Sequence, residues 1–113
     1  MINSGLLAQI EAIGNHRSPA EAIGVILKGK VIELPNRSST PNSTFELRIA
    51  DLLIELEVSR LIVADDDWLE MIIWHTHPKG LIGPSSVDMR SRLQGLKHLV
   101  VALTEEGPVP TFY

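Results

Sequence analysis

Two histidines and one aspartate lie close together in this sequence, at a spacing that suits a shared metal ion. His75 and His77 stand two residues apart, and ten residues separate His77 from Asp88. On a β-strand, residues i and i+2 face the same side, so both imidazoles can reach one ion. Pro78 ends the strand, and a loop with two glycines can bring Asp88 back to the same point. Two imidazoles and a carboxylate, with water as the fourth ligand, are typical of a catalytic rather than a structural zinc site.

Glu21 is the candidate for the general base that a hydrolytic metal site needs. It begins an otherwise apolar predicted strand, where a charged side chain has no packing role. A carboxylate beside the metal can take a proton from the attacking water and pass it to the leaving amine. A second interpretation stays open, a solvated charge at a strand end, because 54 positions separate Glu21 from His75.

Ser85 and Asp88 also have a simpler interpretation. The segment 85–88 (SSVD) matches a capping box, in which both side chains only stabilise the start of a helix. An isolated His-x-His pair likewise occurs often by chance. The combination of both features with the two prolines favours a metal site, and capping is compatible with ligation.

Two segments resemble the signature segments of the JAMM (MPN+) metallopeptidase family. They are residues 21–26 (EAIGVI) and residues 75–88 (HTHPKGLIGPSSVD). The resemblance implies the zinc ligands His75, His77 and Asp88. It also implies Glu21 as general base and Ser85 as a hydroxyl that helps to stabilise the tetrahedral intermediate. Ile23 stands where family members often have cysteine or a small residue, which we expect to alter packing only. The chain resembles the short bacterial, archaeal and phage members, without the insertions of the polyubiquitin-specific ones.

Composition indicates one globular domain over residues 1–113 and argues against several function classes. The chain has 113 residues, of which 44% are hydrophobic and 21% charged. The lack of cysteine excludes thiolate zinc sites, disulfide frameworks and a cysteine nucleophile. A net charge of −4 without a basic run argues against nucleic acid as the main partner. With no signal-peptide pattern and no long apolar run, we expect no membrane partner and a cytoplasmic location.

Hydrophobic periodicity predicts a mixed α/β fold, a JAMM/MPN-like mixed β-sheet flanked by about three helices. The predicted helices are residues 4–16 with Ser4 as N-cap, a helix with Ile49, Leu52, Leu53 and Leu56 on one face, and a helix opening at Ser85 with Met89, Leu93 and Leu96 inward. The predicted strands are residues 21–27, 31–34, 69–75, 98–103 and 109–113. The turn 28–30 joins the first two strands in a hairpin, residues 35–44 and 78–84 are loops, and Asp65 to Asp67 form a solvated turn.

The leading hypothesis is a zinc-dependent hydrolase of peptide or isopeptide bonds. By resemblance, its substrate is the C-terminal tail of a ubiquitin-like or sulfur-carrier protein, or a phage- or cell-wall-related peptide. Such a tail would lie extended beside a strand edge, with the loop 35–44 as one wall. Trp68 and Trp74 are expected to be packing residues, with the lining of that groove as the alternative for Trp74, which is next to the site. His16 and His98 are expected to be structural or exposed.

The main alternative is a catalytically silent MPN-like scaffold that binds protein partners. Such scaffolds usually lose metal ligands, whereas this chain keeps all of them. A cupin would need a glutamate shortly after the second histidine, and residues 79–84 contain none. An HExxH peptidase is excluded, because none of the four histidines is followed by glutamate.

Overall fold

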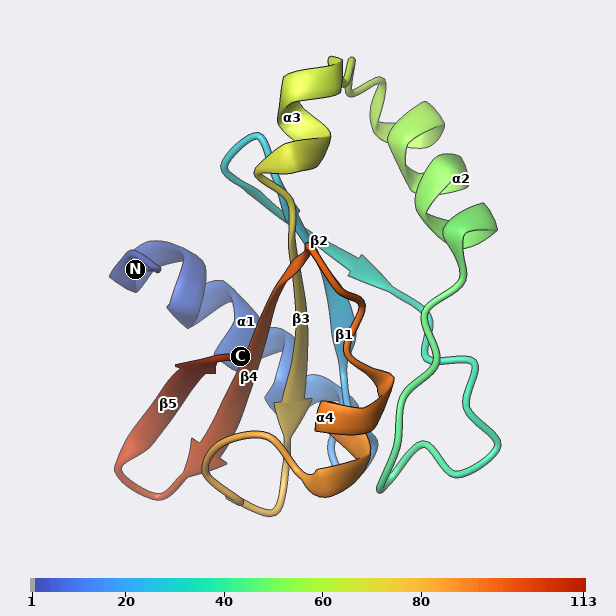
Figure 1. The fold of residues 1–113 in the computed structure, drawn as a ribbon. Helices are drawn as coiled ribbons and strands as arrows, with labels where there is room; N and C mark the ends of the chain where they lie inside the picture. The colour runs from blue at the N-terminus through green and yellow to red at the C-terminus, as the bar shows by residue number, and fades with distance from the viewer. Residues whose placement is uncertain (1) are drawn as a thin grey trace.

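The computed structural model describes residues 2–113 and contains four helices and five strands in this range (Figure 1). The helices are α1 (Ser4–Arg17), α2 (Ile49–Ser59), α3 (Asp65–Leu69) and α4 (Ser86–Ser91). The strands are β1 (Ile23–Leu27), β2 (Lys30–Leu34), β3 (Ile72–His77), β4 (Lys97–Thr104) and β5 (Gly107–Phe112). The predicted mixed α/β fold is confirmed.

The strands form one sheet in the order β2-β1-β3-β4-β5. Only β3 and β4 run parallel, and α4 lies in the connection between them; the other pairs are antiparallel. The predicted hairpin is present, with Lys28 and Gly29 both at positive φ, as a tight two-residue turn requires. β1 is buried along its whole length, which explains its unbroken apolar sequence.

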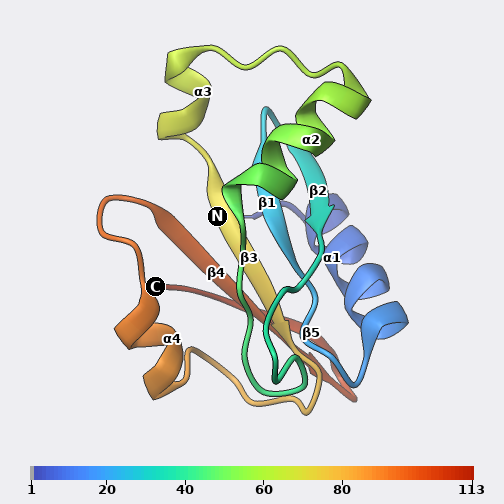
Figure 2. The same cartoon turned by 90° about the vertical axis from the view of Figure 1, so that its right-hand side faces the viewer.

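Each face of the sheet carries its own hydrophobic cluster. One cluster joins α1 to the sheet and includes Ile10, Ile26 and Trp74. The other joins α2 to the opposite face and includes Val25, Leu52 and Ile73. Figure 2 shows α1 on one side of the sheet and α4 on the other. Because side chains alternate along a strand, His75 and His77 share the face of Ile73, away from α1.

The start of α1 is capped one residue earlier than predicted. The side chain of Asn3, not Ser4, accepts the backbone N–H of Leu6 at 2.8 Å. The helix ends before Ser18 as expected, since Pro19 disfavours a helical residue before it. The strand predicted at residues 69–75 is shifted toward the C-terminus. The observed strand β3 begins at Ile72 and ends at His77.

The helix α3 replaces the predicted turn at Asp65 to Asp67. The carboxylate of Asp67 accepts the N–H of Ala64 at 2.8 Å, which satisfies a free donor at the helix start. Three acidic residues in the first turn also interact favourably with the positive end of the helix dipole. These local effects stabilise a short helix that hydrophobic periodicity does not reveal.

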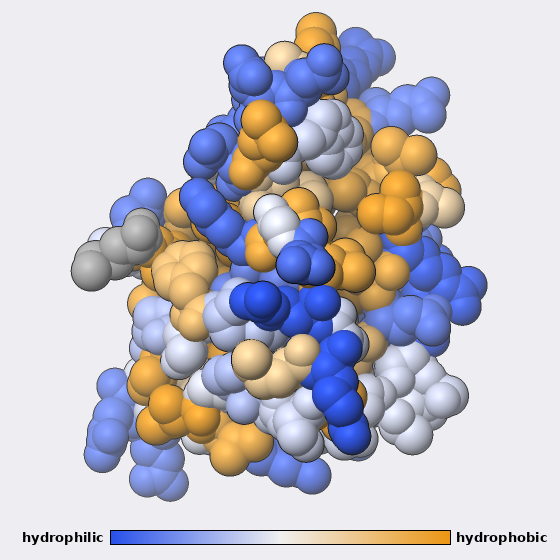
Figure 3. All heavy atoms as spheres, viewed as in Figure 1, coloured by the Kyte–Doolittle hydropathy of each residue, from blue (hydrophilic) through white to orange (hydrophobic). Residues whose placement is uncertain are grey.

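In two helices, some of the residues predicted to face inward are exposed. In α2, Leu52 and Leu56 are buried, but Ile49 and Leu53 are 58% and 54% exposed. Figure 3 shows hydrophobic residues gathered on the surface over α2. The helix rests on the sheet along one narrow stripe, which leaves its neighbouring apolar positions in solvent.

The helix α4 is shorter than predicted, and Met89 and Leu93 are exposed rather than inward. The N–H of Leu93 donates to Nε2 of His98 at 3.1 Å instead of continuing the helix. Leu96 is partly buried and packs against the cluster beneath α2. No helix within residues 2–113 has the length and apolar character needed to cross a membrane.

Candidate metal centre

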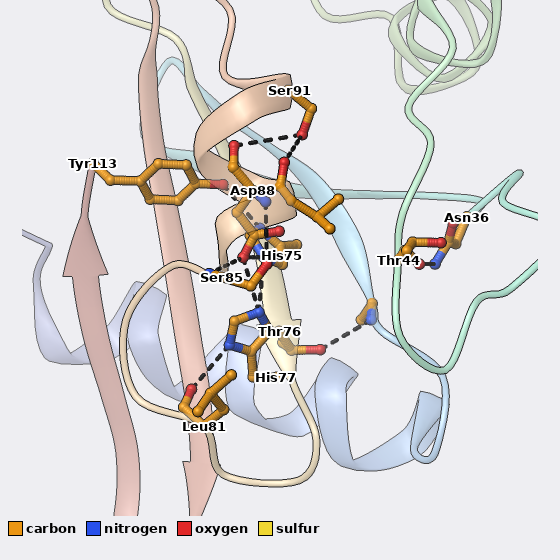
Figure 4. A network of polar contacts seen from close by, with 12 residues as sticks. Asn36, Thr44, His75, Thr76, His77, Leu81, Ser85, Asp88, Ser91 and Tyr113 are labelled. Carbon is orange, nitrogen blue, oxygen red and sulfur yellow. Dashed lines mark hydrogen bonds and ion pairs between the residues drawn. The ribbon is translucent and has the colours of Figure 1, made fainter.

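The three predicted metal ligands meet at one point between β3 and α4. Nε2 of His75 lies 3.3 Å from Nε2 of His77, and Oδ2 of Asp88 lies 3.1 Å from each of these nitrogens. Figure 4 shows both imidazoles and the carboxylate turned toward one another. All three side chains are buried. The structure therefore brings together the residues that the sequence pattern singled out.

The size of this triangle suits a small metal ion. In a tetrahedral zinc site, ligand atoms at about 2.0–2.2 Å from the metal stand roughly 3.3 Å apart. The three separations here, 3.1 to 3.3 Å, match that spacing. The donor set of two imidazoles and one carboxylate also suits a divalent ion such as zinc.

The electrostatics of the triangle favour an ionised carboxylate. Burial alone would raise the pKa of Asp88, but hydrogen bonds from His75 and His77 outweigh it and hold this pKa well below its usual value. Burial lowers the pKa of His75, against the opposing bond to Asp88. Burial also acts to lower the pKa of His77, but its bonds to Asp88 and the Leu81 carbonyl outweigh that effect and raise it. The Asp88 carboxylate is thus ionised and available to a cation.

The imidazole of His77 is fixed from outside the centre by the main chain. Its Nδ1 lies 2.9 Å from the carbonyl oxygen of Leu81, in the loop after β3. With a metal ion bound, a bond from Nδ1–H to this carbonyl would leave the Nε2 lone pair directed at the ion. The ring of Phe45 stacks on His75 with a centroid distance of 4.4 Å.

Glu21 reaches the centre through the pairing of β1 with β3. The register sets Ile23 opposite His75, and its continuation by two residues sets Glu21 against His77. Two bonds between Ala22 and Thr76 hold this continuation: the Ala22 N–H donates to Thr76 Oγ1, and the Thr76 N–H donates to the Ala22 carbonyl, both at 2.9 Å. Glu21 itself precedes β1 rather than opening it.

The loop after β2 holds the main chain of Glu21 from the other side. Its N–H donates to the carbonyl of Pro41 at 2.8 Å, and its carbonyl accepts from Nδ2 of Asn36 at 3.0 Å. Asn36 also donates to the carbonyl of Thr44 (Figure 4), so one amide joins the loop to the residue that enters the site. Glu21 is therefore fixed by both a sheet register and a loop.

The carboxylate of Glu21 is buried beside the two histidines. Ligand atoms of Glu21, His75 and His77 lie within 4.8 Å of one another, and this buried group can hold a metal ion. Glu21 is only 5% exposed, and its Oε1 is buried without a hydrogen-bond partner. Burial, together with the charge of Asp88 and against that of His77, raises its pKa to about 7. Such a carboxyl group can both accept and release a proton near neutral pH.

The raised pKa of Glu21 predicts how the stability of the metal-free protein depends on pH. The folded state favours the neutral carboxyl, so this contribution is full below about pH 4.5 and is lost as pH rises through about 7. We expect unfolding experiments in a chelator to show wild type losing up to about 3 kcal/mol relative to Glu21→Gln across that window. The other groups of the centre titrate in both proteins, so the difference between the two curves reports Glu21 together with its coupling to the charges of His77 and Asp88. Parallel curves for the two proteins would contradict the assigned pKa.

Ser85 and Asp88 form the capping box that the sequence also allowed. Oγ of Ser85 accepts the N–H of Asp88 at 3.1 Å, and Oδ2 of Asp88 accepts the N–H of Ser85 at 2.9 Å. The same Oδ2 contacts both histidines, so capping and ligation coexist in one carboxylate. Ser85 uses its oxygen as an acceptor in the cap, and its hydroxyl hydrogen can still donate elsewhere.

A pocket of about 170 Å³ opens at the centre. Its lining includes Glu21, His77 and Ser85, together with Asn42 and Ser43 from the loop after β2. Two residues of the loop 35–44 thus line the pocket, while a groove for an extended tail with this loop as its wall stays a prediction. The candidate base and the candidate hydroxyl thus line one and the same pocket.

Trp74 is a packing residue, as expected, and does not take the alternative role of lining this pocket. It is fully buried on the opposite face of the sheet, in the cluster beneath α1. Its neighbours on β3 point the other way because side chains alternate along a strand. His16 is exposed and His98 is buried, in line with the roles expected for them.

Two aromatic residues around His75 were not predicted from sequence. Phe45 reaches it from the loop after β2, and Tyr113 reaches it after the end of β5. Burial, followed by the charges of Asp88 and Glu21, raises the pKa of the Tyr113 hydroxyl, which is therefore neutral. Both residues lie far from the motifs in sequence, so no local spacing could have indicated them.

The fold resembles two solution structures. The first is a protein from Desulfitobacterium hafniense, with a TM-score of 0.72 and 19% identity over 97% of this chain and 80% of that one. The second is a protein from Salinibacter ruber, with a TM-score of 0.51 and 16% identity over 97% of this chain and 78% of that one. No family model and no curated protein matches the sequence. At these identities the similarity establishes the fold alone.

Proposed function

We propose that this protein is a zinc-dependent hydrolase of peptide or isopeptide bonds. The observation that carries the proposal is the combination of a triangle of ligand atoms 3.1 to 3.3 Å apart with a buried carboxyl group of raised pKa beside it. His75, His77 and Asp88 would hold the metal. A zinc ion there would supply Lewis acidity, which polarises a carbonyl and lowers the pKa of water to about 7.

Glu21 would act as the general base and then as the general acid. Its carboxylate takes a proton from the attacking water as the water oxygen bonds to the carbonyl carbon. It then delivers that proton to the leaving nitrogen as the carbon–nitrogen bond breaks. A pKa of about 7 suits both steps, since the group is neither too weak a base nor too weak an acid near neutral pH.

Ser85 would stabilise the oxyanion that forms at the carbonyl oxygen. Its hydroxyl lines the same pocket as Glu21 and His77. The capping bond, in which the N–H of Asp88 donates to Oγ of Ser85, holds this oxygen in place. A donor held in place before the reaction stabilises developing charge without reorganisation.

A comparison of two variants, Ser85→Ala and Ser86→Ala, separates oxyanion stabilisation from helix capping. We expect Ser85→Ala to lose about 1 kcal/mol of stability through the lost cap. We also expect its kcat to fall roughly ten- to a hundredfold, toward the lower half of the range for deleted oxyanion donors, because a zinc ion would also polarise the carbonyl oxygen. Ser86 is exposed next to Ser85, so Ser86→Ala should retain the wild-type rate. Rates are compared on folded protein of equal zinc content, and equal kcat in both variants would leave Ser85 with the cap alone.

The proposed substrate is a protein with an extended C-terminal tail, such as a ubiquitin-like or sulfur-carrier protein; a phage- or cell-wall-related peptide is the second class. The proposal rests on the resemblance of residues 21–26 and 75–88 to the JAMM signatures and on the open pocket beside Glu21. The test is a panel of tailed carrier proteins and short peptides, with products identified by mass spectrometry. We expect cleavage that stops in a chelator and returns with zinc. No cleavage of any substrate by zinc-loaded protein would contradict the enzyme proposal.

One observation favours the alternative of a partner-binding scaffold. Four apolar residues of α2 are exposed, and exposed apolar surface often binds other proteins; they are Ile49, Leu53, Ile54 and Val58. The scaffold needs no proton transfer, so it gives no reason for a buried carboxyl group at the metal triangle. Turnover on the substrate panel decides between the two functions.

A further inference from the structure

The outer nitrogen of His75 needs a hydrogen-bond partner. The ring is 1% exposed, and its Nε2 faces His77 and Asp88. When Nε2 binds a metal ion, the ring carries its hydrogen on Nδ1, and a buried N–H without an acceptor is costly. Among the described residues, the only hydrogen-bonding atom within reach of Nδ1 is the hydroxyl oxygen of Tyr113, at 3.5 Å.

The two histidines then follow the same pattern. His77 directs Nε2 inward and has the Leu81 carbonyl at Nδ1. His75 directs Nε2 inward and has the Tyr113 hydroxyl at Nδ1. Histidines that bind metals generally donate their other N–H to such an outer acceptor, which fixes both tautomer and ring orientation.

The position of Tyr113 is itself well determined. Its backbone N–H donates to the carbonyl of His98 at 2.9 Å, which extends the β4–β5 pairing by one residue. Its ring packs on the imidazole of His98, with centroids 5.3 Å apart. His98 is buried and holds the end of the α4 segment through the N–H of Leu93. Figure 4 shows the Tyr113 ring reaching from this strand toward His75 and Asp88.

His75 is thus held on two sides. Phe45 stacks on its face at an interplanar angle of 25°. Tyr113 meets it edge-on, with an interplanar angle of 90° and a centroid distance of 6.1 Å. Stacking on Phe45 limits tilting of the ring but allows it to rotate in its own plane. An acceptor at Nδ1 opposes that rotation, which is the motion that would turn Nε2 away from the centre.

We propose that Tyr113 is a positioning residue of the metal centre, whose hydroxyl oxygen accepts the Nδ1 hydrogen of His75 and keeps Nε2 directed at the ion. The inference rests on the proposed metal site and adds a contribution from the residue after β5 to a centre whose ligands lie on β3 and α4. It concerns metal affinity, so it can be tested without a substrate.

The test compares Zn²⁺ binding by wild type, Tyr113→Phe and Ser86→Ala. Phenylalanine keeps the ring on His98 and removes only the acceptor, while Ser86→Ala removes an exposed hydroxyl near the same centre. The dissociation constant is measured by competition with a chromophoric chelator, and the thermal midpoint is measured without metal. We expect Tyr113→Phe to bind zinc about tenfold more weakly, the lower end of the effect of such outer partners because 3.5 Å is a long bond. Its metal-free midpoint and the affinity of Ser86→Ala should match wild type.

The outcomes separate this inference from the proposed function. If wild type binds zinc tightly and Tyr113→Phe binds it within about twofold, the positioning role is wrong while the metal site stands. A lower metal-free midpoint with unchanged affinity would assign Tyr113 a packing role only and likewise overturn the inference. If wild type binds no zinc, the proposed function fails and the inference fails with it.

A measurement on wild type alone covers the case in which Tyr113→Phe does not fold. In the zinc-loaded protein, the Nδ1 hydrogen of His75 should give a nuclear magnetic resonance signal that exchanges slowly with water, like that of His77. Rapid exchange at His75 alone would show that its Nδ1 hydrogen has no acceptor and would overturn the proposal.

Discussion

Replacing Glu21 with glutamine is expected to leave zinc bound and to lower kcat by roughly a hundredfold or more. The amide keeps the size of the side chain but cannot take a proton from water. The stability of the variant provides a check on folding. Burial raises the pKa of Glu21 to about 7, and glutamine carries no charge that would have to be buried. The variant should therefore be as stable as wild type or more stable at pH 7 and above. A low rate thus cannot be attributed to unfolding.

Zinc content of the Glu21→Gln variant also tests the ligand set. Glu21 belongs to a buried group with His75 and His77 that can hold a metal. We assign the carboxylate ligand to Asp88 instead, since its Oδ2 lies 3.1 Å from both histidine nitrogens. Full zinc occupancy with lost turnover supports that division of roles. Lost zinc would make Glu21 a ligand, and near wild-type turnover would remove it from catalysis.

His75→Ala and His77→Ala are expected to abolish both zinc binding and hydrolysis. Removal of a direct ligand should weaken zinc binding by more than the roughly ten- to hundredfold that outer partners contribute. The measurement is metal content after dialysis against a weak chelator, followed by assay with added zinc.

His16→Ala is the matched control for these variants. His16 is exposed near the end of α1 and takes no part in the centre. We expect its zinc content and rate to equal those of wild type. If both ligand variants kept full zinc, the ion would have to bind elsewhere and the proposed centre would be wrong.

The parts of the site that could be predicted from sequence are those encoded locally. His75 and His77 share a strand face because the period of a strand is two residues. Asp88 follows in the first turn of a helix, and residues 85–88 form the capping box of that helix. These relations need no knowledge of how distant segments pack. The hairpin at residues 28–29 was predictable for the same reason.

The remaining parts depend on pairings between distant segments. Glu21 stands against His77 because of the register between β1 and β3, which spacing alone could not fix. Tyr113 reaches His75 only because β5 pairs with β4. Phe45 comes from a loop whose path depends on several bonds of one amide, that of Asn36.

Helix faces were the least predictable feature of the fold. Leu53 and Met89 have the spacing of inward residues, yet both are exposed. Periodicity shows which positions share a face but not how wide a stripe the sheet covers. In α4 the bond from Leu93 to His98 also ends the helical pattern early.

The most direct test of the central claim is anomalous diffraction at the zinc edge from crystals of zinc-loaded protein. We expect one zinc ion with Nε2 of His75, Nε2 of His77 and Oδ2 of Asp88 at about 2.0–2.2 Å, and the Glu21 carboxylate outside ligand distance. An ion located away from these three atoms, or one bound by Glu21 in place of Asp88, would contradict the account.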